Sequence, residues 1–208
     1  MSLKTFVDSE TGHELMIDAG IPGQIGWDAL VGMARVAKLV PKGGIIVETG
    51  SLFGRSSFVW SKNCDPTAKL FCIDPWVREQ WIIDLVEIAQ QPRMPFSLEA
   101  FRFYTRECTN ITAIEGYSPD VVQASWCHMI DLYFDDSDHN DPGLTRNWSF
   151  WMKWVKPGGV FCGDDYGPHC PDVVNNSNQL AQRWSAKLST SGNFWWLRRP
   201  CGGASGPA

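Results

Sequence analysis

The sequence predicts an α/β protein built on a doubly wound, mainly parallel sheet with helices on both faces. Short apolar runs of strand length recur along the chain, and stretches with helical periodicity separate them. Most of these runs end in a carboxylate. Ligands of such sheets bind outside the carboxyl ends of the strands, where the strand order reverses. We therefore expect the functional site among the polar residues that end the strands.

The elements follow one another in a regular order along the chain. The predicted helices with the clearest periodicity cover residues 27–40, 144–155 and 172–185. The predicted strands cover residues 44–48, 69–74, 111–116, 130–136 and 159–165. Residues 186–190 and 194–199 then flank a short loop that contains Gly192, which is typical of an antiparallel hairpin. The intervening segment 76–95 is predicted to be a lid, a substrate loop or an interface helix.

Composition narrows the class of protein. The 208 residues are 44% hydrophobic and 20% charged, as in a globular domain, and we expect a single domain over residues 1–200 with a disordered tail over 201–208. The net charge of −5 disfavours a nucleic-acid partner. No apolar stretch is long enough to span a bilayer and no signal peptide is recognisable, so we expect a cytoplasmic protein without a membrane partner. Seven cysteines without zinc-like spacing are expected to be reduced.

A glycine-bearing turn follows the first strand, with the pattern Glu-x-Gly-x-x-x-Gly from Glu48 to Gly54. Gly50 would let the backbone approach a ligand, and Gly54 would allow tight packing where a helix begins. The three-glycine dinucleotide pattern is missing, and the leading acid suits the ammonium group of a methionine moiety. The predicted cofactor contacts in this turn are Glu48, Thr49, Gly50, Ser51, Gly54 and Ser56. A plain strand-to-helix turn is the alternative.

The ends of the next two strands extend this cofactor site. A carboxylate at Asp74 can accept hydrogen bonds from both hydroxyls of a ribose, although an Asp before Pro75 is also a common turn former. Gly116 and Ser118 would lie near an adenine. Together with the first turn, these residues predict a nucleoside-bearing cofactor. Asp74 alone would also suit NAD, but the glycine spacing argues against it.

Three acids end the fourth and fifth strands. If these strands are neighbours, Asp136, Asp164 and Asp165 can converge on one hard cation, with Mg²⁺ the natural candidate. Asp136 is also predicted to contact the cofactor. A solvated acidic loop with helix-capping aspartates is the alternative, and Asp135 and Asp138 are assigned to that solvated class. His139, preferred over His169, is predicted to be a general base, with a loop-bracing histidine as the alternative.

The order and spacing of these motifs resemble those of the class I S-adenosylmethionine (SAM)-dependent methyltransferases over about residues 27–199. The resemblance rests on residues 47–56, 72–76, 134–139, 157–160 and 163–167. Within the class, the chain resembles the small-molecule group that includes macrocin O-methyltransferase and the cephalosporin hydroxylase-like proteins. This implies a Rossmann-like seven-stranded sheet of order 3214576 with an antiparallel last strand, and SAM bound across strands one to four. It often implies a metal at positions matching Asp136, Asp164 and Asp165.

The resemblance departs from the family at one point. The usual Asp-Gly-Asp-His sequence is Asp136-Ser137-Asp138-His139 here, so the turn lacks its glycine. We expect a metal-assisted O-methyltransferase in which Asp136 and His139 are catalytic and a small molecule is methylated. A nicotinamide-dependent oxidoreductase and a non-catalytic SAM- or nucleoside-binding module are the rival hypotheses. A homodimer is possible.

Overall fold

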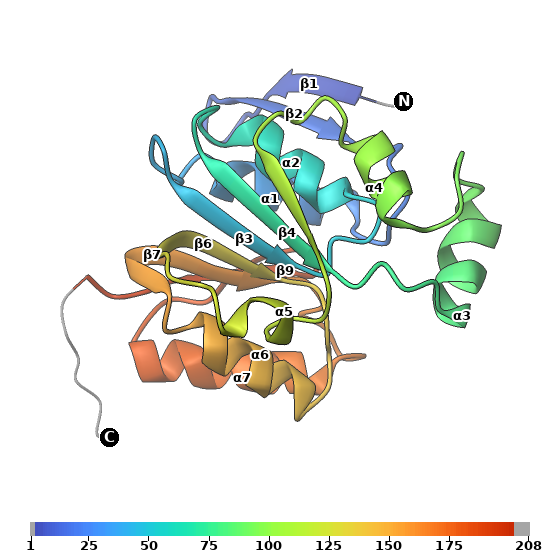
Figure 1. Ribbon diagram of the computed structural model, residues 1–208. Coiled ribbons are helices and arrows are strands. Elements are labelled where there is room, and N and C mark those ends of the chain that lie inside the picture. Colours follow the sequence, from blue (N-terminus) through green and yellow to red (C-terminus); the bar gives the residue numbers. More distant parts are fainter. Residues whose placement is uncertain (1–2, 202–208) are drawn as a thin grey trace.

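The computed structural model describes residues 3–201 and contains a seven-stranded sheet between two layers of helices (Figure 1). In sheet order the strands are β5 (Ile111–Glu115), β4 (Lys69–Asp74), β3 (Ile45–Thr49), β6 (Ile130–Asp135), β7 (Val155–Gly163), β9 (Phe194–Arg198) and β8 (Ser189–Ser191). The pairs from β5 through β7 are parallel, and β9 runs antiparallel to β7 and β8. With these seven strands counted in chain order, this is the expected 3214576 arrangement with an antiparallel last strand. The predicted tail lies, from residue 202 on, outside the described residues.

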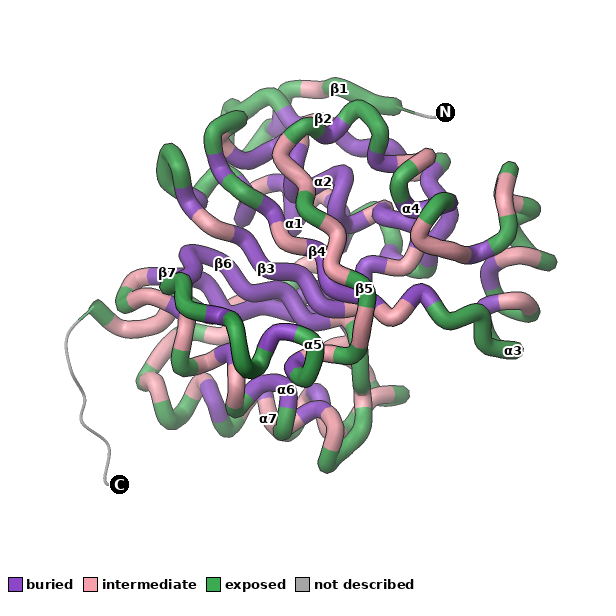
Figure 2. The backbone as a smooth tube through the Cα atoms, in the orientation of Figure 1, coloured by how far each residue is buried: buried purple, intermediate pink, exposed green. Residues whose placement is uncertain are grey.

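The helices divide between the two faces of the sheet (Figure 1). One face carries α1 (Trp27–Ala37), α2 (Arg55–Asn63) and α4 (Leu98–Tyr104), and the other carries α5 (Asp120–Gln123), α6 (Gly143–Trp151) and α7 (Pro171–Trp184). Consecutive residues of a strand point to opposite faces. Ile46 accordingly belongs to the first apolar core and Val47 to the second, and both are fully buried. The central strands are the most buried part of the chain (Figure 2).

The boundary between α6 and β7 differs from the sequence prediction. The helix predicted over residues 144–155 ends at Trp151, and Val155 is already the first residue of β7, paired with Ile130. The Pro157-Gly158-Gly159 segment looks like a turn in sequence, but it lies inside a strand whose register with β6 is irregular. Such an irregularity accommodates residues that regular pairing would disfavour.

An N-terminal hairpin was not predicted from the sequence. It consists of β1 (Leu3–Val7) and β2 (Glu14–Asp18), which form a separate antiparallel pair packed against α1 and α2. The Asn63 side chain ties β2 to the end of α2, because its Oδ1 accepts from the Met16 N–H at 2.9 Å and its Nδ2 donates to the Met16 carbonyl at 2.8 Å. The hairpin therefore extends the first core beyond the sheet.

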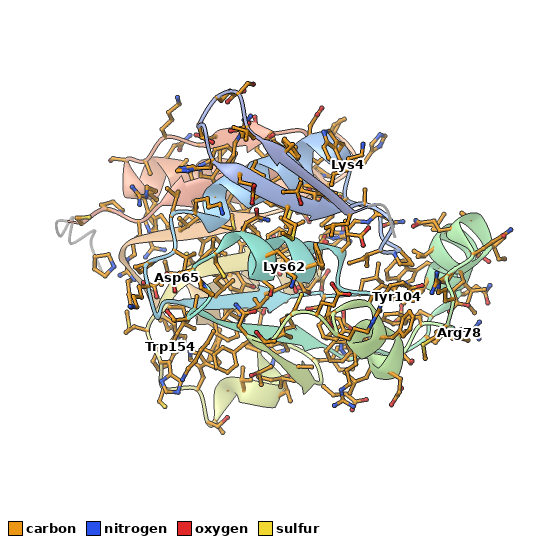
Figure 3. The ribbon with its side chains drawn as sticks, turned by 90° about the horizontal axis from the view of Figure 1, so that it is seen from above. Lys4, Lys62, Asp65, Arg78, Tyr104 and Trp154 are labelled. Carbon is orange, nitrogen blue, oxygen red and sulfur yellow. The ribbon has the colours of Figure 1, made fainter. Side chains whose placement is uncertain are left out.

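The segment predicted to be a lid or an interface helix contains α3 (Gln80–Ile82), which continues as the π-helix η1 (Ile83–Ile88). It projects from the body of the protein beyond the end of β4 (Figure 1). An ion pair between Arg78 and Glu87 stabilises it, and Figure 3 labels Arg78 at its base. Within residues 3–201, no helix is both long enough and apolar enough to cross a membrane.

Candidate functional site

The predicted site residues lie at one end of the sheet, where the parallel strands β3, β4, β5, β6 and β7 end. From β3 the chain continues to β4 and β5 on one side of the sheet, whereas β6 and β7 lie on the other side. The strand order therefore reverses between β3 and β6. This is the place in an open α/β sheet where ligands bind.

Glu48 is fully buried beneath the turn that follows β3. Its Oε2 atom accepts hydrogen bonds from the hydroxyls of Ser51, at 2.8 Å, and Ser57. Burial raises the pKa of Glu48, and nearby hydroxyls, that of Ser56 among them, counteract the rise. Among the described residues, Oε1 has no hydrogen-bond partner. Glu48 thus organises the turn and retains one carboxylate oxygen for a further donor.

Gly50 and Gly54 are both required by close packing within the protein. Gly50 has φ +80°, and a Cβ on it would lie 2.0 Å from the carbonyl oxygen of Asp136. The turn after β3 therefore lies directly against the loop after β6. Gly54 has φ +91°, and a Cβ there would lie 2.4 Å from Thr105 Cγ2. The tight packing expected of Gly54 at the start of a helix is confirmed, with the α4 segment as the partner.

Asp74 joins the ends of β3 and β4. Its two carboxylate oxygens accept hydrogen bonds from the backbone N–H groups of Leu52, at 3.0 Å, and Trp76, at 2.7 Å. Leu52 and Trp76 both have a positive φ, and the Trp76 indole donates to the Leu52 carbonyl at 3.0 Å. Burial raises the pKa of Asp74 to about 6. A carboxylate has about four lone-pair positions, so Asp74 can still accept from a ligand hydroxyl.

Several predicted contact residues also have structural roles. The Ser118 hydroxyl donates to Asn147 Oδ1 at 2.7 Å and accepts from the Trp151 indole at 2.9 Å, which fixes the loop after β5 to α6. The Gly116 N–H donates to the Asp74 carbonyl at 3.0 Å. Pro75, which follows Asp74 in the chain, is half-buried. Ligand contacts from these residues stay predictions.

The prediction that Asp135 belongs to a solvated loop is wrong. Asp135 is only 5% exposed, because it is the last residue of β6 and its side chain points toward α6. Its carboxylate accepts hydrogen bonds from Thr49 Oγ1 at 2.6 Å, Asn147 Nδ2 at 2.9 Å and the Trp148 indole at 2.5 Å. The Thr49 side chain is thereby committed to this buried network. Asp135 and Asp136 do not share a site, as expected from strand alternation.

Asp136, Asp164 and Asp165 converge as the sequence predicted, each offering a carboxylate oxygen within 4.8 Å of the others. Asp164 is 9% exposed, and its Oδ1 atom is buried without a hydrogen-bond partner in the part of the chain that the structure describes. Burial, followed by the charge of Asp165, raises the pKa of Asp164 to about 7. Burial and the two neighbouring carboxylates also raise the pKa of Asp136. Uncompensated carboxylates at this separation repel one another, so the cluster suits a cation.

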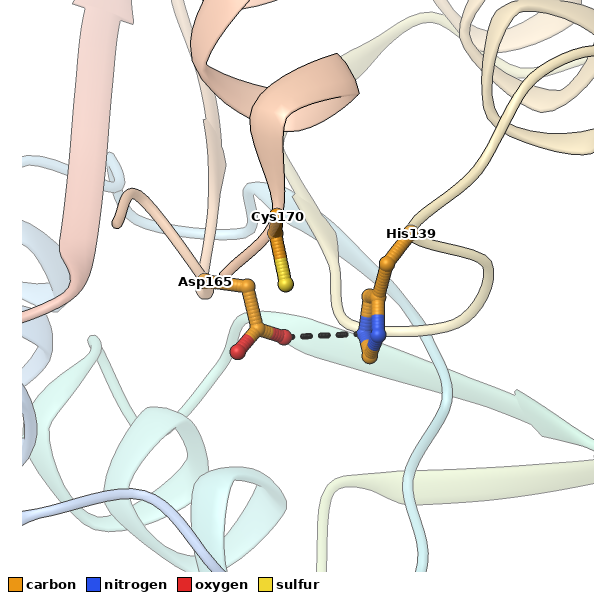
Figure 4. A group of neighbouring side chains, drawn as sticks. All are labelled: His139, Asp165 and Cys170. Atoms are coloured by element: carbon orange, nitrogen blue, oxygen red, sulfur yellow. Dashed lines mark ion pairs between the residues drawn. The ribbon is translucent and has the colours of Figure 1, made fainter. Parts of the chain in front are cut away.

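His139 lies beside this cluster. Its Nε2 atom is 2.8 Å from Asp165 Oδ2 and 3.8 Å from Asp136 Oδ1. These two carboxylates, Asp136 first, raise the pKa of His139 to about 11, so it is protonated at neutral pH while the carboxylates are uncompensated. His169 is exposed. A second group of potential metal ligands, which shares Asp165 with the acidic cluster, consists of His139, Asp165 and Cys170, and Cys170 lies just before α7 and faces the other two (Figure 4). Sequence spacing contains no signal for Cys170, because the loop after β7 brings it into place.

A consequence of these pKa shifts is that the cation-free protein becomes less stable as the pH rises. The folded-state pKa values of Asp74 and Asp164, about 6 and about 7, exceed the ordinary value of 3.8. The protonated carboxyls therefore stabilise the folded state at low pH, and this stabilisation is lost as the pH rises through the folded values. We expect the Tm of the cation-free protein to fall by roughly 5 °C or more between about pH 5 and about pH 8.

Thermal melts in the presence of a chelator measure this effect. The pKa of Asp8 is lowered to about 2, so this group changes stability only below the chosen window. Addition of a divalent cation should flatten the slope, because cation binding favours the ionised carboxylates. A Tm that rises steadily across this window would contradict the assigned shifts.

Comparisons with a family model and with solved structures both find methyltransferases. Residues 47–166, more than half of the chain, match the family model described as a methyltransferase domain. No curated protein sequence matches the chain. The O-methyltransferase NovP has a similar structure, with a TM-score of 0.63 and 15% identity over 85% of this chain and 81% of NovP.

Two further solved structures bind the expected kind of ligand. The O-methyltransferase from Bacillus cereus, solved in complex with SAH, has a TM-score of 0.58 and 14% identity over 86% of this chain and 84% of its own. The O-methyltransferase TomG from Streptomyces achromogenes, solved in complex with SAM, has a TM-score of 0.54 and 18% identity over 86% of this chain and 92% of its own. At these identities the likeness is one of fold.

Proposed function

Because the chain belongs to the methyltransferase domain family, we propose that it transfers a methyl group from SAM to a hydroxyl group of a small molecule with the help of a divalent cation. One observation carries the proposal. The turn predicted to hold the methyl donor and the loop that contributes to the acidic cluster are in backbone contact, at Gly50 and Asp136. A donor on the turn and a substrate at the cluster would therefore be neighbours. The family match disfavours the nicotinamide-dependent alternative.

The turn and the adjoining strand ends supply groups for each part of SAM. The unpartnered Oε1 of Glu48 suits the ammonium group of the methionine moiety. Ser51 and Ser56, near the start of α2, are the residues that we assign to its carboxylate, whereas the Gly50 N–H already donates to the Ile73 carbonyl at 2.9 Å. Asp74 retains lone pairs for the ribose hydroxyls. Gly116 and Ser118 follow β5, on the adenine side of the proposed site.

The acidic cluster fits a divalent cation. Asp136, Asp164 and Asp165 offer hard oxygen donors, and Asp164 also has a buried Oδ1 without a hydrogen-bond partner among the described residues. A bound cation lowers the pKa of a substrate hydroxyl and thereby makes its oxygen a better nucleophile. Asp165 also has a positive φ of +61°, a left-handed conformation that aspartate adopts more readily than most residues.

The methyl transfer itself is an in-line displacement. The substrate oxygen forms a bond to the methyl carbon as the bond to sulfur breaks, and the sulfur leaves as a neutral thioether. Since the sulfonium is already activated, approach to about 3–3.5 Å and alignment supply most of the rate. Asp136 helps to orient the hydroxyl. The proton of the substrate hydroxyl passes to His139 or to water. His139 can accept this proton only when the charge of the neighbouring carboxylates is compensated and the imidazole is neutral.

Replacement of Asp74 with Ala should weaken SAM binding by about 10- to 100-fold, because one or two hydrogen bonds from ribose hydroxyls to a carboxylate are lost. Isothermal titration calorimetry with SAM measures the change. Asp65→Ala is the control, because Asp65 is a half-buried acid in the loop between α2 and β4, away from the predicted site. Equal affinity in Asp74→Ala and the control would remove Asp74 from the site.

The proposed reaction is tested by following the formation of S-adenosylhomocysteine with phenols and sugars as acceptors. We expect formation to require both an acceptor and a divalent cation, and to stop when a chelator is added. Turnover that is indifferent to the chelator would exclude the metal role while leaving methyl transfer intact. The small-molecule nature of the methyl acceptor, location in the cytoplasm and dimer formation stay predictions from the sequence.

A further inference from the structure

Nitrogen and sulfur donors lie beside the carboxylates of the acidic cluster. One donor atom from each of His139, Asp165 and Cys170 lies within 4.8 Å of the other two. Figure 4 shows the three side chains directed toward one another. They come from three separate segments, the loop after β6, the loop after β7 and the residue before α7. The fold thus assembles three chemically different metal-binding groups in one place.

The contacts within this group leave donor atoms available. His139 Nε2 lies 2.8 Å from Asp165 Oδ2, yet within the described residues it makes no well-directed hydrogen bond. The adjacent Asp164, 9% exposed, has a buried oxygen that is also unpartnered. Zinc binds imidazole nitrogen at about 2.0–2.1 Å and thiolate sulfur at about 2.3 Å, so ligands of one ion lie about 3–4 Å apart. The donor atoms of the group lie within 4.8 Å of one another, and His139 Nε2 and Asp165 Oδ2 are 2.8 Å apart, so side-chain adjustments bring them to that spacing.

We propose that His139, Asp165 and Cys170 bind a divalent transition-metal ion of the zinc class, with Asp165 shared with the acidic cluster. Imidazole and thiolate ligands favour Zn²⁺ and Co²⁺, whereas Mg²⁺ is held by oxygen ligands. Binding releases two protons to solvent, one from the Cys170 thiol and one from the His139 imidazolium, because the thiolate and the neutral imidazole are the ligands. The site shares Asp165 and His139 with the proposed reaction, but neither its geometry nor its test involves SAM.

The proposed site changes the role of His139. An imidazole nitrogen bound to a metal ion cannot accept a proton, so the proton of a substrate hydroxyl would pass to water or to Asp136. The two groups that share Asp165 differ in ligand type, because the acidic cluster offers only oxygen, whereas the second group adds nitrogen and sulfur. Selection of Zn²⁺ over Mg²⁺ by the second group would depend on Cys170, its one sulfur donor.

Cobalt(II) is the probe for this site, because a bond from Co²⁺ to a thiolate gives a charge-transfer absorption in the near ultraviolet. The protein is stripped of metal and titrated with Co²⁺ in a Cys127→Ser/Cys201→Ser background, which removes the two exposed cysteines. We expect the absorption to saturate at a single ion per chain and to persist in excess Mg²⁺. Cys170→Ser should abolish it, and His139→Gln should weaken Co²⁺ binding by at least about tenfold.

Two outcomes overturn the proposal. One is the lack of a Co²⁺-thiolate absorption band in the Cys127→Ser/Cys201→Ser protein, and the other is an unchanged band after Cys170→Ser is added. Thermal melts of each variant establish that it is folded, and His139→Gln provides a test that leaves the thiol in place. Calorimetry with SAM on the same samples separates the two proposals. SAM binding without a thiolate band would remove this site alone, and a thiolate band without SAM binding would remove the methyltransferase proposal alone.

Discussion

Replacement of Asp164 with Asn is expected to lower turnover at least about 100-fold and to abolish its dependence on a divalent cation. Asp164 contributes the buried oxygen that has no partner among the described residues, and its charge is one of three that attract the cation. An amide at this position is neutral and a weaker ligand. Initial rates of S-adenosylhomocysteine formation, measured over a range of Mg²⁺ concentrations, give both quantities.

Although Asp164→Asn should lower turnover, it should raise the thermal stability of the cation-free protein. Ionised Asp164 is buried beside Asp165, so its removal relieves an unfavourable charge at about pH 8, and the cation-free variant should melt at a higher temperature than the wild type. Asp120→Asn is the matched control, because Asp120 forms an exposed ion pair with Arg146 away from the cluster. Full activity and normal Mg²⁺ dependence in Asp164→Asn would exclude the metal role of this residue.

Replacement of Gly50 with Ala is expected to destabilise the fold by on the order of 2–5 kcal/mol. The new Cβ would lie 2.0 Å from the Asp136 carbonyl oxygen, and the positive φ of +80° adds a conformational cost. Backbone cannot move aside as a side-chain end can. The turn and the loop after β6 must therefore separate, and we expect SAM affinity to fall with stability. Urea denaturation gives the change in unfolding free energy.

Gly43→Ala provides the control for Gly50→Ala. Gly43 also has a positive φ, of +68°, but nothing lies within 4 Å of a Cβ built on it. This variant therefore carries the conformational cost without the steric one. If Gly50→Ala proves no less stable than Gly43→Ala, the close contact between the turn and the Asp136 loop is not a feature of the protein in solution.

The topology of the sheet was predictable because the burial of each strand leaves a local pattern in the sequence. Strands buried on both faces appear as continuous apolar runs, and β4 was predicted with the bounds it has in the structure, Lys69–Asp74. The N-terminal hairpin was not predictable in the same way. In β2, Leu15 and Ile17 are buried only because the hairpin packs on α1 and α2, and that contact is not visible in a five-residue pattern.

The site was predictable where it depends on strand ends and unpredictable where it depends on loops. Asp136, Asp164 and Asp165 follow two strands whose adjacency follows from the sheet order. Asp135 was misjudged because its burial is set by partners on α6, Asn147 and Trp148, whose position depends on tertiary packing. Cys170 was missed for a similar reason, since only the path of the loop after β7 brings it to the cluster.

The central claim is that the turn from Glu48 to Gly54 binds the methyl donor. Isothermal titration calorimetry with SAM, S-adenosylhomocysteine and NAD, each with and without Mg²⁺, tests it most directly. We expect SAM and S-adenosylhomocysteine to bind one molecule per chain and NAD not to bind. Failure of both SAM and its demethylated product to bind the folded protein would contradict the claim.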